Sequence, residues 1–454
     1  MNFVISTGPV EKHNAEVRKL IRTHVMLGKN RGRVLPPRKK KNKVAVASLS
    51  EKPLSESVTT SPRNFGSDLC AVRFADTVTP EAVTSILRFS SIIKGILYPL
   101  EKCIFFDRRA DVWVTPLATD PAYLHIVIFS SQYYFNNILP KQSGYGTITF
   151  RRSTHLSKSV KLLRERLADG EGVEKISNTT TAVIMSLAGH AFMMGDMKSA
   201  RNHIEGLYKV FALRGGVASY QGAAKLLVEV LRMDIGLALY DGSKGLFFDR
   251  EPMIPLPNLS LLLPLDFEIL RNPIIFSNGL DHQLAGIWNV LAQFCAVVNL
   301  ALESSQFITS ETYLETMAST FYRLLDMRFD PWSRNEVVRL GLLAFSAGVL
   351  LQWRHMGVRY SHFTNLFRIC LEDISTSEIS PELMIWLLMV GAVGVFDDSD
   401  DIWLMPLLRS QSEICGLRSW GEMKILLESF LWVGWVFDEP GRRIFGSMND
   451  GLAC

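Results

Sequence analysis

The sequence lacks cysteines spaced closely enough to suggest a zinc site or a disulfide framework. Its 454 residues contain six cysteines, and the two nearest, Cys70 and Cys103, are 33 positions apart. Structural zinc sites and disulfide-rich domains need ligands or partners at short, regular spacings such as C-x₂-C. We therefore expect reduced, mostly buried thiols and no metal.

Signatures of the common enzyme classes are missing too. There is no G-x-S-x-G, no phosphate-binding loop, no H-E-x-x-H, and no G-x-G-x-x-G that opens a βαβ unit. His190 and His203 flank Gly195-Asp196 and could form a general-base or metal site, but no nucleophile or third ligand accompanies them. Asp196 is explained more simply as a helix N-cap. We predict no catalytic residues, no cofactor and no enzymatic activity.

No apolar run is both long and uninterrupted enough to span a bilayer. The longest stretch without a charged or histidine side chain, residues 284–302, carries Asn289, Gln293 and Asn299 at roughly helical spacing. This pattern indicates a buried helix with a polar stripe. Residues 383–396 are apolar but only fourteen long, as in a core helix. The first residues do not resemble a signal peptide, so we expect neither secretion nor a membrane partner.

The net charge is small, +4 from 49 basic and 45 acidic residues, but its distribution is uneven. Residues 12–43 hold twelve Lys or Arg against one acid, Glu16, which leaves 37 basic and 44 acidic residues, or −7, for the remainder. A basic arm on a mildly acidic body is typical of a protein that contacts a polyanion with one end. Five of these cations fall within residues 38–43, a pattern typical of a nuclear import signal.

We predict two roles for this basic arm, nuclear import and salt-sensitive contact with DNA phosphates. A helix is expected within it over residues 15–27, capped by Asn14, but thirteen residues are marginal alone. Nothing in the arm fixes side chains against base edges, so the contact with DNA would be nonspecific. The residues assigned to these roles are Arg18, Lys19, Arg22, Lys29, Arg31, Arg33, Arg38, Lys39, Lys40, Lys41 and Lys43.

Three segments are predicted along the chain. Residues 1–45 form the basic arm, disordered apart from its short helix. Residues 46–65 form a linker, because seven of the fifteen residues 48–62 are Ser or Thr and two are Pro. Residues 66–450 form the folded body, in which apolar residues recur at helical spacing. Helices are expected at 80–95, 121–136, 156–168, 223–239, 311–327, 335–352, 363–371, 381–395, 402–415 and 419–435, and β-like runs at 103–106, 112–114 and 147–150 are interpreted as extended connectors.

The clearest unit in the body is a helical hairpin. One helix is predicted from residue 177 or 178 to 194, where Gly195 ends it, and Asp196 caps a second helix that runs to residue 213, before Arg214-Gly215-Gly216. Neighbouring helices can stack on this pair. We therefore predict an all-α fold, an irregular α-solenoid-like stack of antiparallel helices without a regular repeat. Eight of the nine tryptophans lie from Trp288 onward, and we expect them in the core.

At this point two sets of residues resemble a known family. The opening F-V-x-S-T-G-P, the later R-T-H-V-M-x-G-K-N and the following P-R-K-K-K resemble the N-terminus of transcription-factor-like proteins of filamentous fungi. The middle segment is similar to the fungal-specific transcription factor domain, as are residues 336–343 and the tryptophan-rich C-terminal part. The motif residues of the middle segment, for which the resemblance implies a structural role, are Gly195, Asp196, His203, Gly206, Arg214, Gly215 and Gly216.

The resemblance implies an all-helical regulatory domain, a nuclear location and control of transcription, often of clustered metabolic genes. Many members of this family carry a binuclear zinc cluster built on two C-x₂-C-x₆-C repeats, and no cysteine here has that spacing. The favoured function is a nuclear transcriptional regulator that works with other transcription factors or co-regulators. The alternative is a helical interaction scaffold or co-regulator without direct DNA contact. An enzyme whose site is invisible in one sequence is the least favoured.

Overall fold

Helices in this chain begin where a small polar side chain precedes an apolar run. The hydroxyl oxygens of Ser177, Ser333 and Ser380 each accept a hydrogen bond from the backbone N–H three residues on, at 3.1, 3.2 and 3.3 Å. Each bond satisfies one of the N–H groups that have no partner within the first turn of a helix. The predicted all-α fold is confirmed: the described part of the chain holds fifteen α-helices and two strands of two residues each.

The computed structural model describes residues 73–96, 98–106, 113–138, 154–168, 176–220, 222–248, 254–264, 279–353, 358–374 and 378–450. All of them belong to one compact unit, residues 62–454. Its α-helices are α2 (Pro80–Ile96), α4 (Thr115–Thr119), α5 (Pro121–Tyr133), α6 (Thr154–Ala168), α7 (Asn178–Met193), α8 (Met197–Arg214), α9 (Ala224–Asp241), α11 (His282–Ser304), α12 (Ser310–Asp326), α13 (Arg334–Ser346), α14 (Ser361–Asp373), α15 (Pro381–Gly394), α16 (Asp401–Ile414), α17 (Trp420–Glu428) and α18 (Gly434–Asp450). Short 3₁₀ helices are η2 (Pro99–Lys102), η6 (Val217–Tyr220) and η7 (Leu259–Leu262), and π-helical turns are η3 (Tyr134–Ile138) and η8 (Ala347–Leu351).

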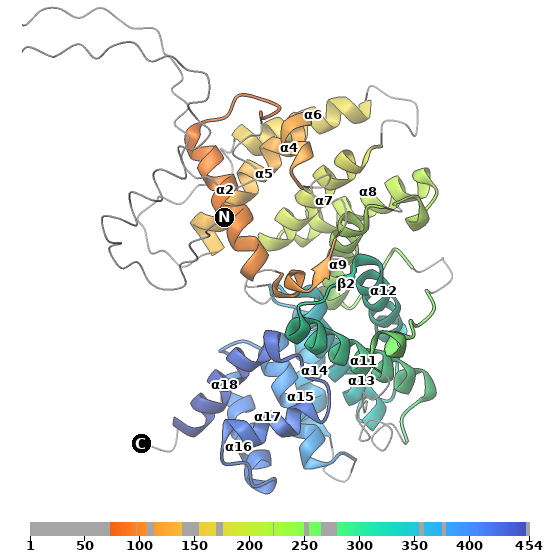
Figure 1. Cartoon of the computed structure of the whole chain (residues 1–454), viewed down its shortest axis with the longest axis vertical. Coiled ribbons are helices and arrows are strands. Elements are labelled where there is room, and N and C mark those ends of the chain that lie inside the picture. Colours follow the sequence, from red (N-terminus) through yellow and green to blue (C-terminus); the bar gives the residue numbers. More distant parts are fainter. Residues whose placement is uncertain are drawn as a thin grey trace, which may run out of the picture. The chain divides into compact units, whose positions relative to one another are not determined.

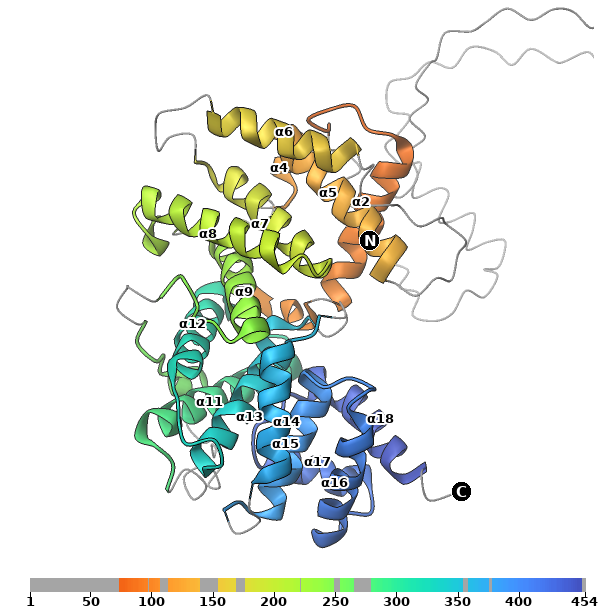
Figure 2. The same ribbon diagram turned by 180° about the vertical axis from the view of Figure 1, so that it is seen from behind.

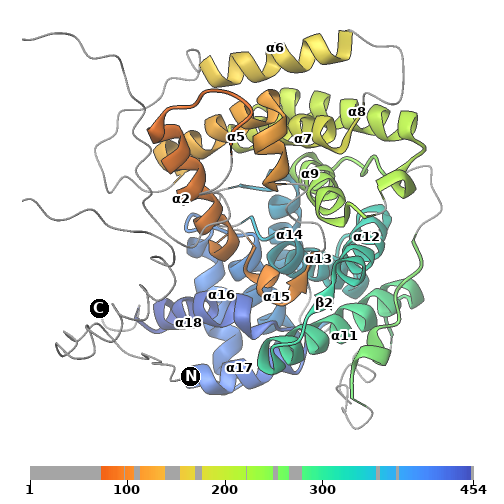
Figure 3. The same cartoon turned by 45° about the horizontal axis from the view of Figure 1, so that its top comes forward.

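Helix α9 lies between two groups of helices, as Figure 1 and the reverse view in Figure 2 both show. Helices α2 and α4–α8 lie on one side of it, with α6 outermost and packed on α5 (Figure 3). Helices α11–α18 lie on the other side, where α12 and α14 pack directly on α9. Fifteen consecutive residues of α9, Lys225–Leu239, are buried. The element that joins the two groups is therefore also one of the most enclosed.

One small parallel sheet links the same two groups. Strand β1 (Ile104–Phe105) pairs with β2 (Ile308–Thr309), with Ile104 opposite Ile308. The predicted β-like run at 103–106 is thus a strand, paired with a segment some two hundred residues away. The run predicted at 112–114 is not extended where it is described, since Trp113 and Val114 lead into α4, and the run at 147–150 lies outside the described residues. Phe106 packs edge to face on Tyr313 of α12, with ring centroids 6.2 Å apart.

Most predicted helices are confirmed to within two or three residues at either end, but one prediction is wrong. A single helix was expected over 419–435. The structure ends α17 at Glu428 and starts α18 at Gly434, with a turn between them. Leu431, Trp432 and Val433 in this turn are fully or almost fully buried. Because these residues are apolar, they continued the apolar pattern from which a single helix was predicted. In the structure they hold the turn against the core instead.

The polar stripe predicted for residues 284–302 is confirmed in α11. The side chain of Gln293 accepts a hydrogen bond from the backbone N–H of Leu259 at 2.9 Å, and that of Asn299 donates to the carbonyl of Trp432 at 3.1 Å. By length and composition α11 could cross a membrane, as no other helix in the described part of the chain could, but core helices meet the same criterion. Here 61% of its most apolar window is buried within the protein.

The tryptophans divide between core and surface, so the expectation that all eight lie in the core is partly wrong. Trp288 and Trp386 are fully buried with ring centroids 5.1 Å apart, and the Trp386 indole donates to the carbonyl of Leu431. Trp332 and Trp435, by contrast, are 57% and 52% exposed. Trp435 is at the first turn of α18, where Lys102 lies over its ring at 3.9 Å. Helical spacing predicts on which face of a helix a residue lies, but only the packing shows whether another element covers that face.

Candidate functional site

The two sets of residues singled out in the sequence differ in what the structure says of them. The eleven cations of the basic arm that were assigned to import and phosphate contact all lie outside the described residues. The seven motif residues of the middle segment are described, and they lie at the ends and along the length of the α7–α8 hairpin. Three of them, Gly195, Gly215 and Gly216, have left-handed backbone conformations, with φ of 73°, 98° and 83°. Such angles favour glycine because it has no Cβ.

The Arg-Gly-Gly sequence ends α8. The N–H groups of Gly215 and Gly216 donate to the carbonyls of Ala212 and Phe211, at 3.2 and 2.8 Å, which satisfies the last acceptors of the helix. Arg214 then folds over the ring of Tyr220 at 4.0 Å and donates to the side chain of Asn178 at the start of α7. The motif thus fastens the open end of the hairpin.

The other motif residues lie where the hairpin turns and along α8. Asp196 caps α8 by accepting from the N–H of Ser199 at 3.1 Å, as predicted. Burial lowers the pKa of His203. His190 sits between the rings of Phe129 and Tyr133, with centroids 4.2 and 4.8 Å away, and burial lowers its pKa to about 4. Within the described residues no three His, Cys, Asp or Glu side chains converge as a metal site would require.

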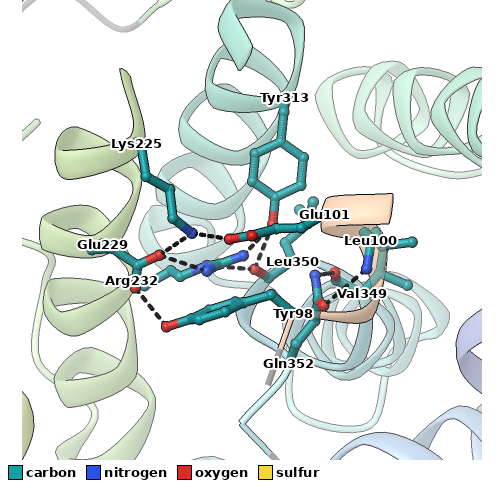
Figure 4. Close-up of polar contacts among 10 residues, drawn as sticks. All are labelled: Tyr98, Leu100, Glu101, Lys225, Glu229, Arg232, Tyr313, Val349, Leu350 and Gln352. Atoms are coloured by element: carbon teal, nitrogen blue, oxygen red, sulfur yellow. Dashed lines mark hydrogen bonds and ion pairs between the residues drawn. The ribbon is translucent and has the colours of Figure 1, made fainter. Parts of the chain in front are cut away.

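The most unusual feature of the body was missed by the sequence reasoning. A buried cluster of ionised and phenolic side chains lies against α9, and we call it the Arg232 cluster (Figure 4). Its members are Tyr98, Glu101, Lys225, Glu229, Arg232 and Tyr313. A signal was present in the sequence: Lys225, Glu229 and Arg232 recur at i, i+4 and i+7 in a helix that is otherwise almost wholly apolar. This spacing puts three charges on one face of a helix that has no exposed side.

Glu229 is at the centre of the Arg232 cluster. Its carboxylate accepts from Lys225 at 2.7 Å, from Arg232 at 2.9 Å and from the hydroxyl of Tyr98 at 2.8 Å. Lys225 also pairs with Glu101 from η2. The Lys225 ammonium and the Arg232 guanidinium lie over the ring of Tyr98, at 4.1 and 4.6 Å from its centroid. Each charge is therefore met by opposite charge, a hydrogen bond or a ring face.

Arg232 connects this cluster to the second group of helices. Its Nε donates to the carbonyl of Leu350 at 2.9 Å and its Nη2 to the hydroxyl of Tyr313 on α12 at 2.7 Å, and Tyr313 itself donates to the same carbonyl at 2.8 Å. That carbonyl is available because it lies at the end of the π-helical turn formed by residues 347–351, where the last carbonyls of a helix have no partner within the helix. The turn ends at Gln352, whose φ is 61°, an uncommon left-handed value for a residue with a side chain.

The pKa directions follow from this arrangement. Burial by itself raises the pKa of Glu229, but Lys225 and Arg232 outweigh it and leave the pKa below its usual value. Burial likewise opposes the charge of Arg232, yet Tyr313 and Glu229 raise the pKa of the guanidinium. Burial and the charge of Glu229 together raise the pKa of Tyr98 well above its ordinary range. At neutral pH the cluster therefore holds ionised Glu229 and Arg232 and neutral tyrosines.

Asp234, in the second half of the same helix, fixes the position of the loop that follows α9. Its carboxylate accepts from the backbone N–H groups of Leu246 and Phe247, at 2.8 and 3.3 Å, and from the hydroxyl of Tyr322 on α12 at 2.8 Å. Burial raises the pKa of Asp234 to about 6 despite these donors. Asp234 and the Arg232 cluster thus give the buried helix α9 polar contacts with the elements packed around it. The chemistry of these groups is that of a structural tie, because their polar atoms engage one another.

The cysteines fit the expected picture where they are described. Cys103, Cys295 and Cys370 are buried and Cys415 is half-buried, and none of the four is in a disulfide. Burial raises the pKa of Cys103 to about 11 and that of Cys370 to about 12, so both thiols stay protonated at neutral pH. Cys70 and Cys454 lie outside the described residues.

Comparison with known proteins identifies part of the body. Residues 97–235 match the family model described as fungal specific transcription factor domain. No curated protein and no solved structure matches the chain. The matched segment contains the α7–α8 hairpin with its seven motif residues, and it ends within α9, three residues beyond Arg232. Residues 97–235 are therefore similar to the fungal specific transcription factor domain, and this likeness supports a role in the regulation of transcription.

Proposed function

We propose that this protein is a nuclear regulator of transcription, acting on clustered metabolic genes, in which the basic arm serves import and nonspecific phosphate contact. The helical body is then the regulatory part, which binds other transcription factors or co-regulators. The family match over residues 97–235 carries the first part of this proposal. The second part rests on eleven net positive charges gathered in residues 12–43 of a chain whose remainder is acidic.

The structure of the helical body supports its proposed role as the regulatory part. The Arg232 cluster ties five members within the matched segment to Tyr313 and Leu350 beyond it, so the segment and the remaining helices are joined by buried, directional bonds. Such bonds fix one relative arrangement of the elements they join more strictly than apolar packing does. A part that must present one surface to a partner benefits from this rigidity.

Fluorescence anisotropy on unrelated DNA duplexes tests the phosphate contact. In one full-length variant, Arg38, Lys39, Lys40, Lys41 and Lys43 are changed to Gln. The matched control removes five exposed cations of the body instead: Lys161, Arg164, Lys198, Lys209 and Arg418. If each arm cation neutralises one phosphate, the slope of log K against log salt becomes shallower by about 4.5 in the arm variant. The control should keep the slope of the unmodified protein.

The outcomes separate the two functions considered. Unchanged binding by the arm variant would contradict phosphate contact by the arm. If the unmodified protein does not bind DNA at low salt, the co-regulator without DNA contact is the better description. The import role is read independently, from the location of the same two variants fused to a fluorescent protein in fungal cells. We expect the arm variant to be excluded from nuclei and the control to enter them.

A further inference from the structure

Three large aromatic side chains are exposed where the small parallel sheet meets the start of α18. Phe105 of β1, Phe307 just before β2 and Trp435 of α18 are 56%, 64% and 52% exposed. The rings of Phe105 and Phe307 lie edge to face with centroids 6.3 Å apart, and Lys102 lies over the ring of Trp435. A single exposed apolar side chain is ordinary, whereas several gathered together mark a contact surface.

These side chains share one stretch of surface, which we call the aromatic patch: Lys102, Phe105, Phe307 and Trp435. Lys102 and Phe105 are three positions apart, so their Cα atoms are separated by at most about 11 Å. The sheet fixes Phe307 beside Phe105, because Ile104 pairs with Ile308. Contact between α18 and η2 fixes Trp435 beside Lys102. Segments that are far apart in the sequence therefore bring the three rings together.

The backbone beneath the aromatic patch is held firmly. Cys103, Ile104 and Ile308 are almost fully buried, and the N–H of Ile308 donates to the carbonyl of Cys103 at 2.8 Å. The exposed rings thus stand on a part of the body that is anchored in the core. Little conformational freedom is lost when such a surface binds a partner, which favours binding.

The two ends of the aromatic patch carry opposite charges. Lys102 is exposed at the end next to Trp435, and the exposed Glu303 and Glu311 lie four positions before and after Phe307. A surface with an apolar middle, a cation at one end and acids at the other is complementary to a copy of itself related by a two-fold axis. A partner with charge of one sign would be repelled at one end. The charges therefore favour a second copy of this chain.

The size of the aromatic patch indicates how strong such a contact would be. Three aromatic side chains that are slightly more than half exposed present roughly 250–450 Å² in total. Stable interfaces bury about 800 Å² on each partner, and weak, transient ones bury less. Even with the flanking charged residues included, the patch therefore suits a dimer that forms and dissociates in the micromolar range.

We propose that the aromatic patch is the centre of a two-fold interface between two copies of this chain. Phe105, Phe307 and Trp435 of one copy pack on the same residues of the other. Lys102 of each copy faces Glu303 and Glu311 of the other. This self-association goes beyond the proposed function and does not depend on it, because it is measured without DNA.

Sedimentation velocity of the full-length protein, from about 1 to 200 µM in reducing buffer, tests the interface. We expect a reversible monomer–dimer equilibrium with a dissociation constant of about 1–100 µM. Phe105→Ser combined with Phe307→Ser should raise this constant at least about tenfold, because it removes two central rings. The matched control combines Leu261→Ser and Ile402→Ser, at side chains 84% and 85% exposed on η7 and α16. The control should associate as the unmodified protein does.

Charge reversal tests the orientation of the two copies. Lys102→Glu alone places acid against acid at both ends of the dimer, and Glu303→Lys combined with Glu311→Lys places cation against cation. Each variant should therefore dimerise at least about fivefold more weakly than the unmodified protein. A mixture of the two should recover the association, because both ends of the mixed dimer then pair opposite charges. A loss of folding in either variant could not produce this recovery.

A full-length protein that stays monomeric at every concentration would overturn the proposal. So would equal weakening by the serine control, or a mixture of the charge variants that associates no better than either alone. Hydrogen–deuterium exchange of the unmodified protein at about 1 and 200 µM provides a test without substitutions. Peptides that contain residues 102–106 and 306–311 should exchange more slowly at the higher concentration, and unchanged exchange there would equally contradict the interface.

Discussion

At the scale of single residues, the charge of Glu229 depends on the buried cations that surround it. Among the described residues it is the carboxylate that pairs with Arg232, and both side chains are almost fully buried. Removing one member of a buried pair leaves the other charge without compensation in a medium that solvates it poorly. The same reasoning does not apply to an exposed pair, where water takes over the lost contact.

We therefore predict that Glu229→Gln, which keeps the shape and removes the charge, lowers the free energy of unfolding by about 3–5 kcal/mol. The matched control is Glu165→Gln, in the exposed pair that Glu165 forms with Lys161 four residues earlier at 3.7 Å. We expect that variant to change stability by less than about 0.5 kcal/mol. Urea denaturation followed by circular dichroism measures both. Equal effects in the two variants would show that the buried pair is not compensated as described.

At the scale of elements, two glycines show how the same residue type serves different ends. Gly394 lies at the end of α15, where a Cβ would come within 2.7 Å of the carbonyl oxygen of Ala344 in α13. The absence of a side chain lets the backbones of these two helices approach closely. Gly206 lies in the middle of α8, and a Cβ there would meet nothing within 4 Å. Its only physical effect on α8 is the conformational freedom that glycine adds to the unfolded chain.

Alanine substitutions should accordingly have opposite signs. Gly394→Ala should destabilise the protein by about 1–3 kcal/mol, because backbone atoms must move to make room. Gly206→Ala should stabilise it by about 0.5–1 kcal/mol, because alanine restricts the unfolded chain and has the higher helix propensity, and its Cβ meets no clash. Chemical denaturation of both variants checks the pair. A destabilised Gly206→Ala would mean that this motif position has a packing role that the present arrangement of α8 does not contain.

At the scale of the whole body, α9 and the Arg232 cluster make the matched segment and the later helices depend on each other. Leu350 and Tyr313 complete the bonds of Arg232, and β2 completes the pairing of β1. Neither group of helices keeps its buried polar atoms satisfied without the other. Elements related in this way unfold together.

The distribution of tryptophan makes this testable. Eight of the nine tryptophans lie from Trp288 onward, so fluorescence reports on the later helices, whereas circular dichroism reports on all of them. We expect the two unfolding curves of the full-length protein to coincide in denaturant. A fluorescence transition displaced from the dichroism transition would show that residues 97–235 unfold separately, and would contradict the coupling through α9.

The helices themselves were largely predictable because their signals are local. Ser177, Asp196 and Gly215 mark helix boundaries through hydrogen bonds and backbone angles that involve only nearby residues. The polar stripe of α11 was predictable for the same reason. The break between α17 and α18 was not, because Leu431, Trp432 and Val433 are apolar in order to fill the core and not in order to continue a helix.

The sequence by itself determined the all-helical class, the α7–α8 hairpin, the family likeness and the unequal distribution of charge, since each depends on composition or on residues a few positions apart. Only the tertiary structure decided the candidate sites. Arg232 meets Tyr313 and Leu350 across separations of 81 and 118 residues. His125 meets Asp76 and His155 across separations of 49 and 30 residues. Nearby residues in the sequence do not predict such contacts. They form when folding buries distant polar groups together, so that these groups bond to one another in place of water.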